Sequence, residues 1–244
     1  MKKLLIITVL ISLSGMILTS CGNSGKNTAM KSPEQNESKS EENEGKENEG
    51  NESLVKQGTD VKAKTTENML AAFKGETTAS AKYAAYSKKA EQEGYHQIAL
   101  LFKAASTSEN IHANNHKAVL QESGTVLPTI KPEFTIKSTK ENLEDAIKGE
   151  TYEVTTMYPD FITTANTANN QMALISLNYA YKTEKKHKVM YTTALIALNN
   201  KTDKNLPSVF YICSTCGNTY ETTAPARCGI SMTSSDKFLK LTSV

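Results

Sequence analysis

An internal duplication constrains the fold of this chain more than any other feature. The segment Asn68-Met-Leu-Ala-Ala-Phe-Lys-Gly-Glu-Thr77 returns as Asn142-Leu-Glu-Asp-Ala-Ile-Lys-Gly-Glu-Thr151, with Lys-Gly-Glu-Thr intact. Further along, Glu109-Asn-Ile-His112 is matched by Glu184-Lys-Lys-His187, so the two copies stay in register over most of their length. Because internal repeats mark a repeated supersecondary unit, the sequence predicts one unit that occurs twice.

Each copy contains two stretches with the periodicity of a helix. We expect helices over residues 65–92 and 95–122 in the first copy, and over 139–167 and 170–199 in the second. Gly94 and the pair Asn169-Asn170 are turn-forming residues at the two junctions. The intervening segment 124–138 contains two prolines and is too long for a tight turn, which suits a crossover along a bundle. The predicted fold is therefore a mostly α four-helix bundle with one long connection, over residues 61–202.

The N-terminal 60 residues have a different character. Lys2 and Lys3 precede an apolar run that is shorter than the roughly 20 residues of a membrane-spanning helix, as expected for an export signal over residues 1–20. The run ends in Leu18-Thr19-Ser20-Cys21, which resembles a bacterial lipobox, whose cysteine is lipidated and becomes the mature N-terminus. We expect an exported protein that is lipid-anchored to the cell membrane and faces outside the cytoplasm. An uncleaved anchor helix is the alternative.

Residues 21–60 begin with the lipidated cysteine and continue with Asn, Glu, Ser, Lys and Gly. Such a segment buries too little apolar surface to offset the entropy of ordering. We therefore predict a disordered tether between the membrane and the bundle.

The duplicated helices carry carboxylates and imidazoles at a spacing that suits metal ions. Residues three apart share a helix face, so each Glu-x-x-His directs one carboxylate and one imidazole to the bundle interior. With one glutamate from the first helix of each copy, the set has the pattern of ferritin-like di-iron bundles, and its donors suit iron or manganese. The six residues are Glu76, Glu109, His112, Glu150, Glu184 and His187. A further carboxylate, Glu153, occurs in the second copy only.

Four other side chains have two interpretations each. His96 and His116 match nothing in the repeat and are interpreted as surface or packing residues, with assistance to the metal chemistry as the alternative. Tyr83 lies two turns beyond Glu76, and Tyr158 lies five residues beyond Glu153, so both can project near the site. Packing in the core is the alternative for both tyrosines.

Taken together, these motifs resemble rubrerythrin over about residues 65–244. The resemblance rests on Gly75-Glu76 with Tyr83, Glu109-x-x-His112, Gly149-Glu150-Thr-Tyr-Glu153 with Tyr158-Pro159, and Glu184-x-x-His187. It implies a ferritin-like bundle with two iron ions, ligated by Glu76, Glu109, His112, Glu150, Glu153, Glu184 and His187. It also implies a homodimer that reduces hydrogen peroxide to water. Four residues would have catalytic roles: His112 would exchange with Glu153 as the iron changes oxidation state, and Tyr83 and Tyr158 would hydrogen-bond the ligand carboxylates.

The C-terminal residues 203–244 resemble a rubredoxin module and then depart from its pattern. Cys213-Ser-Thr-Cys216-Gly217 matches the first knuckle, and Cys228 continues the site. Ser231 occupies the position of the fourth cysteine. Its alkoxide oxygen, a harder and more basic donor, would favour ferric over ferrous iron and lower the reduction potential relative to four thiolates. A vestigial or zinc-filled knuckle and a Cys213–Cys216 disulfide are the alternatives.

The nearly even balance of basic and acidic residues gives no support to a nucleic-acid partner. The chain has 28 basic and 26 acidic residues and a formal charge of +2. The first hypothesis for the function is an enzyme, a rubrerythrin-type peroxidase that protects against peroxide, with electrons from an unidentified donor relayed by the C-terminal site. The alternative is a membrane-anchored iron-binding or ferroxidase-like protein without sustained turnover, because the C-terminal site lacks its fourth cysteine. Steady peroxide consumption with an electron donor separates the two.

Overall fold

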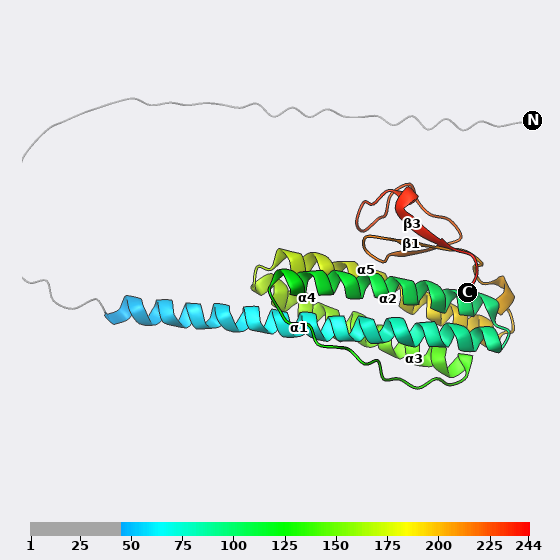
Figure 1. Cartoon of the computed structure of the whole chain (residues 1–244), viewed down its shortest axis with the longest axis horizontal. Coiled ribbons are helices and arrows are strands. Elements are labelled where there is room, and N and C mark those ends of the chain that lie inside the picture. The colour runs from blue at the N-terminus through cyan, green and yellow to red at the C-terminus, as the bar shows by residue number, and fades with distance from the viewer. Residues whose placement is uncertain (1–44) are drawn as a thin grey trace, which may run out of the picture. The chain divides into compact units, whose positions relative to one another are not determined.

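The computed structural model describes residues 45–244, and the side chains from residue 58 onward. Its long helices are α1 (Gly45–Gln92), α2 (His96–Glu122), α3 (Thr139–Tyr152), α4 (Tyr158–Thr167) and α5 (Gln171–Asn199). A π-helical turn, η1 (Glu153–Met157), joins α3 to α4. Helix α1 packs along α2, and α3, η1 and α4 pack along α5 (Figure 1). The predicted mostly α four-helix bundle is confirmed.

Two helices differ from their predicted extents. Helix α1 begins at Gly45 and not near residue 65, so residues 45–60 are helical where a disordered tether was predicted. This segment contains no proline, and its Lys, Glu, Gln and Leu residues are good helix formers, which extend the helix although few of them are apolar. The predicted helix over 139–167 is interrupted by η1. The predicted signal peptide and Cys21 lie outside the described residues.

The turns follow the local chemistry of the sequence. Gly94 between α1 and α2 has a φ of +83°, and Asn169 between α4 and α5 has a φ of +52°, a region that Gly and Asn adopt at low cost. The side chain of Asn170 accepts a hydrogen bond from the Ala173 N–H and caps α5. The crossover before α3 has no regular secondary structure and runs along the bundle (Figure 1). It ends at Ser138, which forms a capping box at the start of α3.

Two apolar clusters occupy the two ends of the bundle. One contains Tyr83, Phe102, Leu143 and Tyr191 among other residues. The other contains Met69, Leu120, Tyr158 and Leu177 among others. On α1, α2 and α5, the predicted ligands lie between the residues of the two clusters. The polar site is therefore enclosed by apolar packing on both sides.

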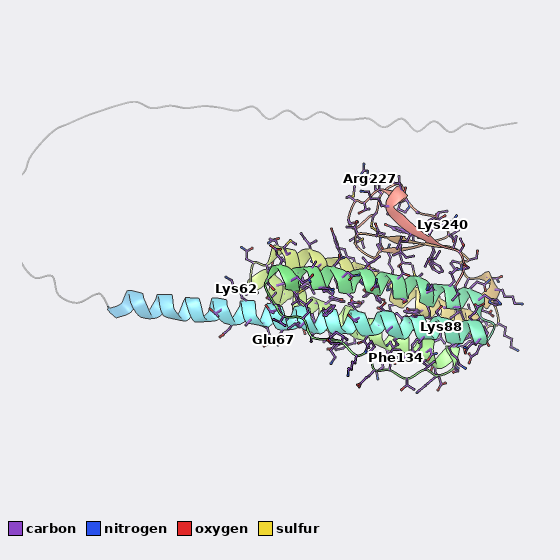
Figure 2. The ribbon with its side chains drawn as sticks, viewed as in Figure 1. Lys62, Glu67, Lys88, Phe134, Arg227 and Lys240 are labelled. Atoms are coloured by element: carbon purple, nitrogen blue, oxygen red, sulfur yellow. The ribbon has the colours of Figure 1, made fainter. Side chains whose placement is uncertain are left out.

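The C-terminal residues form a small antiparallel sheet. Strands β1 (Phe210–Cys213), β2 (Thr219–Glu221) and β3 (Phe238–Leu241) have the order β2-β1-β3. Two short 3-10 turns, η2 (Asp203–Asn205) and η3 (Ser235–Lys237), precede β1 and β3. The sheet contacts α2 and α5 through β1 and β2. Figure 2 shows Arg227 of this module and Phe134 of the crossover on opposite sides of the bundle.

None of the helices in the described part of the chain is long and apolar enough to cross a membrane.

Candidate metal centre

Six of the seven predicted bundle ligands meet between the two apolar clusters, and each is at most 1% exposed. The side chains form two groups of four, and within each group the donor atoms all lie within 4.8 Å of one another. One group is Glu76, Glu109, His112 and Glu184, and the other is Glu109, Glu150, Glu184 and His187. Because Glu109 and Glu184 belong to both groups, they are suited to bridge two ions. The duplication thus produces two similar half-sites with shared carboxylates.

Both histidines direct Nδ1 toward the carboxylates. The Nδ1 atom of His112 is 2.9 Å from Glu109 Oε2 and 2.8 Å from Glu184 Oε1. The Nδ1 atom of His187 is 2.7 Å from Glu184 Oε2 and 3.1 Å from Glu109 Oε1. Since the shared carboxylates approach both imidazoles, Nδ1 is the nitrogen available to a metal ion on each ring.

The residues present fit a pair of cations. Four buried carboxylate oxygens, one on each of Glu76, Glu109, Glu150 and Glu184, accept no well-directed hydrogen bond in the described structure. Those of Glu109 and Glu184 have an imidazole Nδ1 atom nearby, which already carries a hydrogen bond to another carboxylate oxygen. Burying a charged oxygen without a partner is expensive, and proteins satisfy such groups with counter-ions or metals. Two divalent ions between these oxygens would supply that compensation. Carboxylates with two imidazoles are donors that iron accepts.

The pKa values of the ligand carboxyl groups indicate which of them keep a proton when no metal is bound. Burial, reinforced by Glu109 and Glu184, raises the pKa of Glu76 to about 8. Burial also raises the pKa of Glu150, together with repulsion from Glu184. Burial opposes the charge on Glu109, but His187 and His112 outweigh it and hold the pKa of Glu109 at about 2. The metal-free site therefore retains protons where the cations would bind.

Glu153 differs from the six other ligand candidates. It is the first residue of the π turn, is half-buried, and belongs to neither group of four. Burial and the charges of Glu76 and Glu184 raise the pKa of Glu153, so its carboxyl lies within electrostatic reach of the site. A single π turn within an α-helix is frequently a functional feature.

The two predicted tyrosines contact ligand carboxylates. The Tyr83 hydroxyl donates to Glu150 Oε1 at 2.8 Å. The Tyr158 hydroxyl donates a hydrogen bond to Glu76 Oε1. Both rings also belong to the apolar clusters, so each tyrosine packs in the core and contacts a ligand carboxylate at the same time.

The two remaining histidines have different environments. His96 is exposed and pairs with Glu91. His116 is fully buried, with Nδ1 2.7 Å from Ser176 Oγ and Nε2 3.3 Å from the Tyr158 hydroxyl. Burial, together with the charge of His112, lowers the pKa of His116 to about 3, so the ring is neutral. His116 therefore contacts the Tyr158 hydroxyl, which in turn hydrogen-bonds the ligand Glu76.

The C-terminal module gathers its three cysteines into a second metal-type cluster. Cys213, Cys216 and Cys228 are buried free thiols, and their sulfur atoms lie within 4.8 Å of one another. The alternative of a Cys213–Cys216 disulfide is not formed. Three convergent thiols can hold one metal ion.

This module contacts the bundle site directly. The Nε2–H of His112 donates to the carbonyl oxygen of Cys216 at 3.1 Å. The Nε2 atom of His187 is 3.0 Å from Thr219 Oγ1. Each histidine thus has Nδ1 toward the carboxylates and Nε2 toward the module, an arrangement that fixes the ring orientation.

Gly217 makes the close approach sterically feasible. It has a φ of +75°, and its carbonyl accepts a hydrogen bond from Ser108 Oγ at 2.7 Å. A Cβ atom at this position would lie 2.4 Å from His112 Nε2. Sequence reasoning did not find the contacts between the module and the bundle, because they join residues 32 to 109 positions apart and leave no periodic pattern. The one local signal was the glycine that follows Cys216.

Comparison with known proteins gives a consistent assignment. The family model described as Rubrerythrin matches residues 67–195. The chain is 34% identical to rubrerythrin-2 of Clostridium acetobutylicum over 180 residues, covering 72% of this chain and 96% of that protein. It is 33% identical to nigerythrin of Nitratidesulfovibrio vulgaris over 188 residues, covering 76% of this chain and 91% of that protein.

Solved structures agree with the sequence comparisons. A structure of nigerythrin in its fully reduced, all-ferrous state has a TM-score of 0.65 and 34% identity, covering 72% of this chain and 86% of that one. Bacterioferritin BfrA of Mycobacterium tuberculosis has a TM-score of 0.54 at 16% identity, which shows the ferritin-like fold alone. The chain belongs to the rubrerythrin family, and its buried carboxylate–histidine cluster is a di-iron site.

Proposed function

We propose that this rubrerythrin-type oxidoreductase is a peroxidase that reduces hydrogen peroxide to water. The observation that carries the proposal is a pair of four-ligand groups that share Glu109 and Glu184. Peroxide cleavage consumes two electrons and two protons and yields two water molecules. A di-ferrous centre supplies both electrons, one from each ion, which matches this stoichiometry.

The residues around the centre hold the ligands and exclude water. Tyr83 and Tyr158 fix one oxygen of Glu150 and one of Glu76, which leaves the other oxygen of each carboxylate for a metal ion. The apolar clusters on both sides restrict water, and electrostatic interactions are strong in such surroundings. His116 Nε2 contacts the Tyr158 hydroxyl and helps to hold it in position.

Glu153 and His112 are proposed to alternate as ligands of the same ion. In support, His112 belongs to the group of four that includes Glu76, while Glu153 lies nearby outside that group. Glu153 also begins a π turn, and single π turns within α-helices occur frequently at functional sites. The half-buried carboxyl would join the harder ferric ion, and His112 would join the ferrous ion.

Electrons are proposed to return through the C-terminal module. The hydrogen bond from His112 Nε2 to the Cys216 carbonyl joins a cysteine of the module to a ligand of the di-iron site without an intervening side chain. An external electron donor would reduce the module first. The three cysteines of the module also pack against Tyr179 of α5, so the thiol cluster adjoins the bundle.

We also propose that the protein works as an exported, lipid-anchored homodimer. The lipobox ending in Cys21 supports the anchor, and two or three acyl chains would hold the protein stably at a membrane. Mass spectrometry of membrane-extracted protein tests the anchor, since a diacylglyceryl mass on a peptide that begins at Cys21 is expected. An unmodified peptide that spans Ser20 and Cys21 would contradict it.

Steady-state peroxide consumption tests the peroxidase proposal. The iron-loaded chain, supplied with a chemically reduced rubredoxin as donor, is expected to consume many equivalents of peroxide for each di-iron centre. The matched variant His187→Ala should lose this turnover, because one group of four loses its imidazole. Oxidation of the iron followed by an arrest after one turnover, with the donor still reduced, would favour the iron-binding or ferroxidase-like alternative.

A further inference from the structure

The hydroxyl oxygen of Ser231 lies beside the three thiols of the C-terminal module. Its Oγ atom is 3.3 Å from Cys213 Sγ. The sulfur atoms of Cys216 and Cys228 are themselves 3.4 Å apart. One oxygen therefore lies against a cluster of three sulfurs, and four such donors are the number that a tetrahedral metal site requires.

The hydrogen bonds of Ser231 direct its lone pairs toward that point. Thr233 Oγ1 donates to Thr215 Oγ1 at 2.8 Å and is also 2.8 Å from Ser231 Oγ. Because the Thr233 proton is used by Thr215, the Ser231 hydroxyl donates to Thr233 and keeps its lone pairs for the cysteine side. When the thiols are deprotonated by metal binding, oxygen lone pairs facing thiolates repel unless a cation lies between them.

We infer that Ser231 is the fourth ligand of a mononuclear iron site with three sulfur donors and one oxygen donor. The inference deepens the proposed electron relay and is independent of whether peroxide is turned over. On binding ferric iron the Ser231 hydroxyl loses its proton to solvent, and the resulting alkoxide is a harder ligand than a thiolate. It stabilises ferric relative to ferrous iron, so the site has a lower reduction potential than a four-cysteine site. The module then holds a strongly reducing ferrous ion next to the di-iron site.

Electron paramagnetic resonance of the iron-loaded full chain tests this inference. The oxidised di-iron centre is magnetically coupled and silent, so the high-spin ferric signal reports the module alone. Ser231→Cys is expected to shift this signal and the sulfur-to-iron absorption bands, and to raise the potential. Ser231→Ala is expected to weaken iron binding in the module at least about tenfold, as the loss of a ligand does. Ser214→Ala, which removes an exposed hydroxyl of the same knuckle, is the control and should change neither.

Two results would overturn the inference. In the first, wild type and Ser231→Ala have the same signal and the same iron affinity. In the second, the wild-type module binds no iron while Ser231→Cys binds one. The bundle should hold two iron ions in every variant, so failure of the module is distinguishable from failure of the di-iron site.

Discussion

Gly217→Ala is the substitution that most directly challenges the contact between the C-terminal module and the di-iron site. The added Cβ would lie 2.4 Å from His112 Nε2 and 2.8 Å from Ser108 Oγ, both on fully buried side chains of α2. Ordinary carbon contacts are about 3.5 Å, so the module must move away from α2 by roughly 1 Å. This movement breaks the hydrogen bonds from His112 to Cys216 and from Ser108 to Gly217.

The expected loss of folding free energy is the sum of three terms, one for the backbone conformation of residue 217 and one for each of the two lost hydrogen bonds. The positive φ of Gly217 costs an alanine about 1 kcal/mol, and each lost hydrogen bond costs about 1 kcal/mol. A loss of about 3 kcal/mol lowers the Tm by on the order of 10 °C for a unit of this size. Calorimetry measures this shift, and stopped-flow absorbance measures the rate at which the reduced module re-reduces the oxidised di-iron site, which should fall.

Gly229→Ala in the same module is the matched control. Its Cβ would lie 3.8 Å from the Tyr220 hydroxyl oxygen, an ordinary van der Waals contact, so stability and rate should stay close to those of wild type. If Gly217→Ala behaved like this control in both assays, the module would not be docked on His112 in solution, and the proposed electron path would be refuted.

Three further predictions concern the bundle. Glu153→Ala should retain two iron ions but slow peroxide reduction in stopped-flow assays, because Glu153 lies outside both groups of four; unchanged kinetics would remove its role. His187→Ala should lower the affinity for one of the two irons at least about tenfold in metal titrations, and an unchanged stoichiometry and affinity would show that the ligand is misassigned. Folding without metal raises the pKa of Glu76 from 4.5 to about 8 and that of His187 from 6.5 to about 10, so the folded chain keeps protons that the unfolded chain has lost. The Tm of the metal-free chain should therefore fall as the pH rises from 5 to 8, and a rising Tm over this range in calorimetry would contradict the assignment.

The sequence was sufficient for the bundle and most of the di-iron site because their signals are local. Glu109 and His112 are three residues apart on one helix, and the same spacing at Glu184 and His187 identified the second half-site. The duplication supplied the pairing of the halves. Helix propensity and side-chain spacing are properties of short segments, so they can be recognised without coordinates.

The features that were missed depend on long-range contacts or small backbone changes. The extension of α1 to Gly45 follows from helix propensity in a segment whose composition suggested disorder. The π turn at Glu153 has no composition signal that separates it from an α-helix. The contact of His112 with Cys216 joins two domains predicted separately, and the buried partnership of His116 with Tyr158 joins α2 to α4. Such packing appears only when the helices are assembled.

Peroxide titration of the fully reduced, iron-loaded chain tests the central claim most directly. Iron analysis gives the number of ions in each chain, and Mössbauer spectroscopy follows the ferrous and ferric iron of both sites. The account predicts three iron ions in each chain and one peroxide consumed for every two ferrous ions oxidised. In rapidly frozen samples it predicts that the di-iron site is oxidised first and that the C-terminal site then loses its electron to the di-iron site. Peroxide loss with the di-iron site still ferrous, or a bundle that binds no iron, would contradict it.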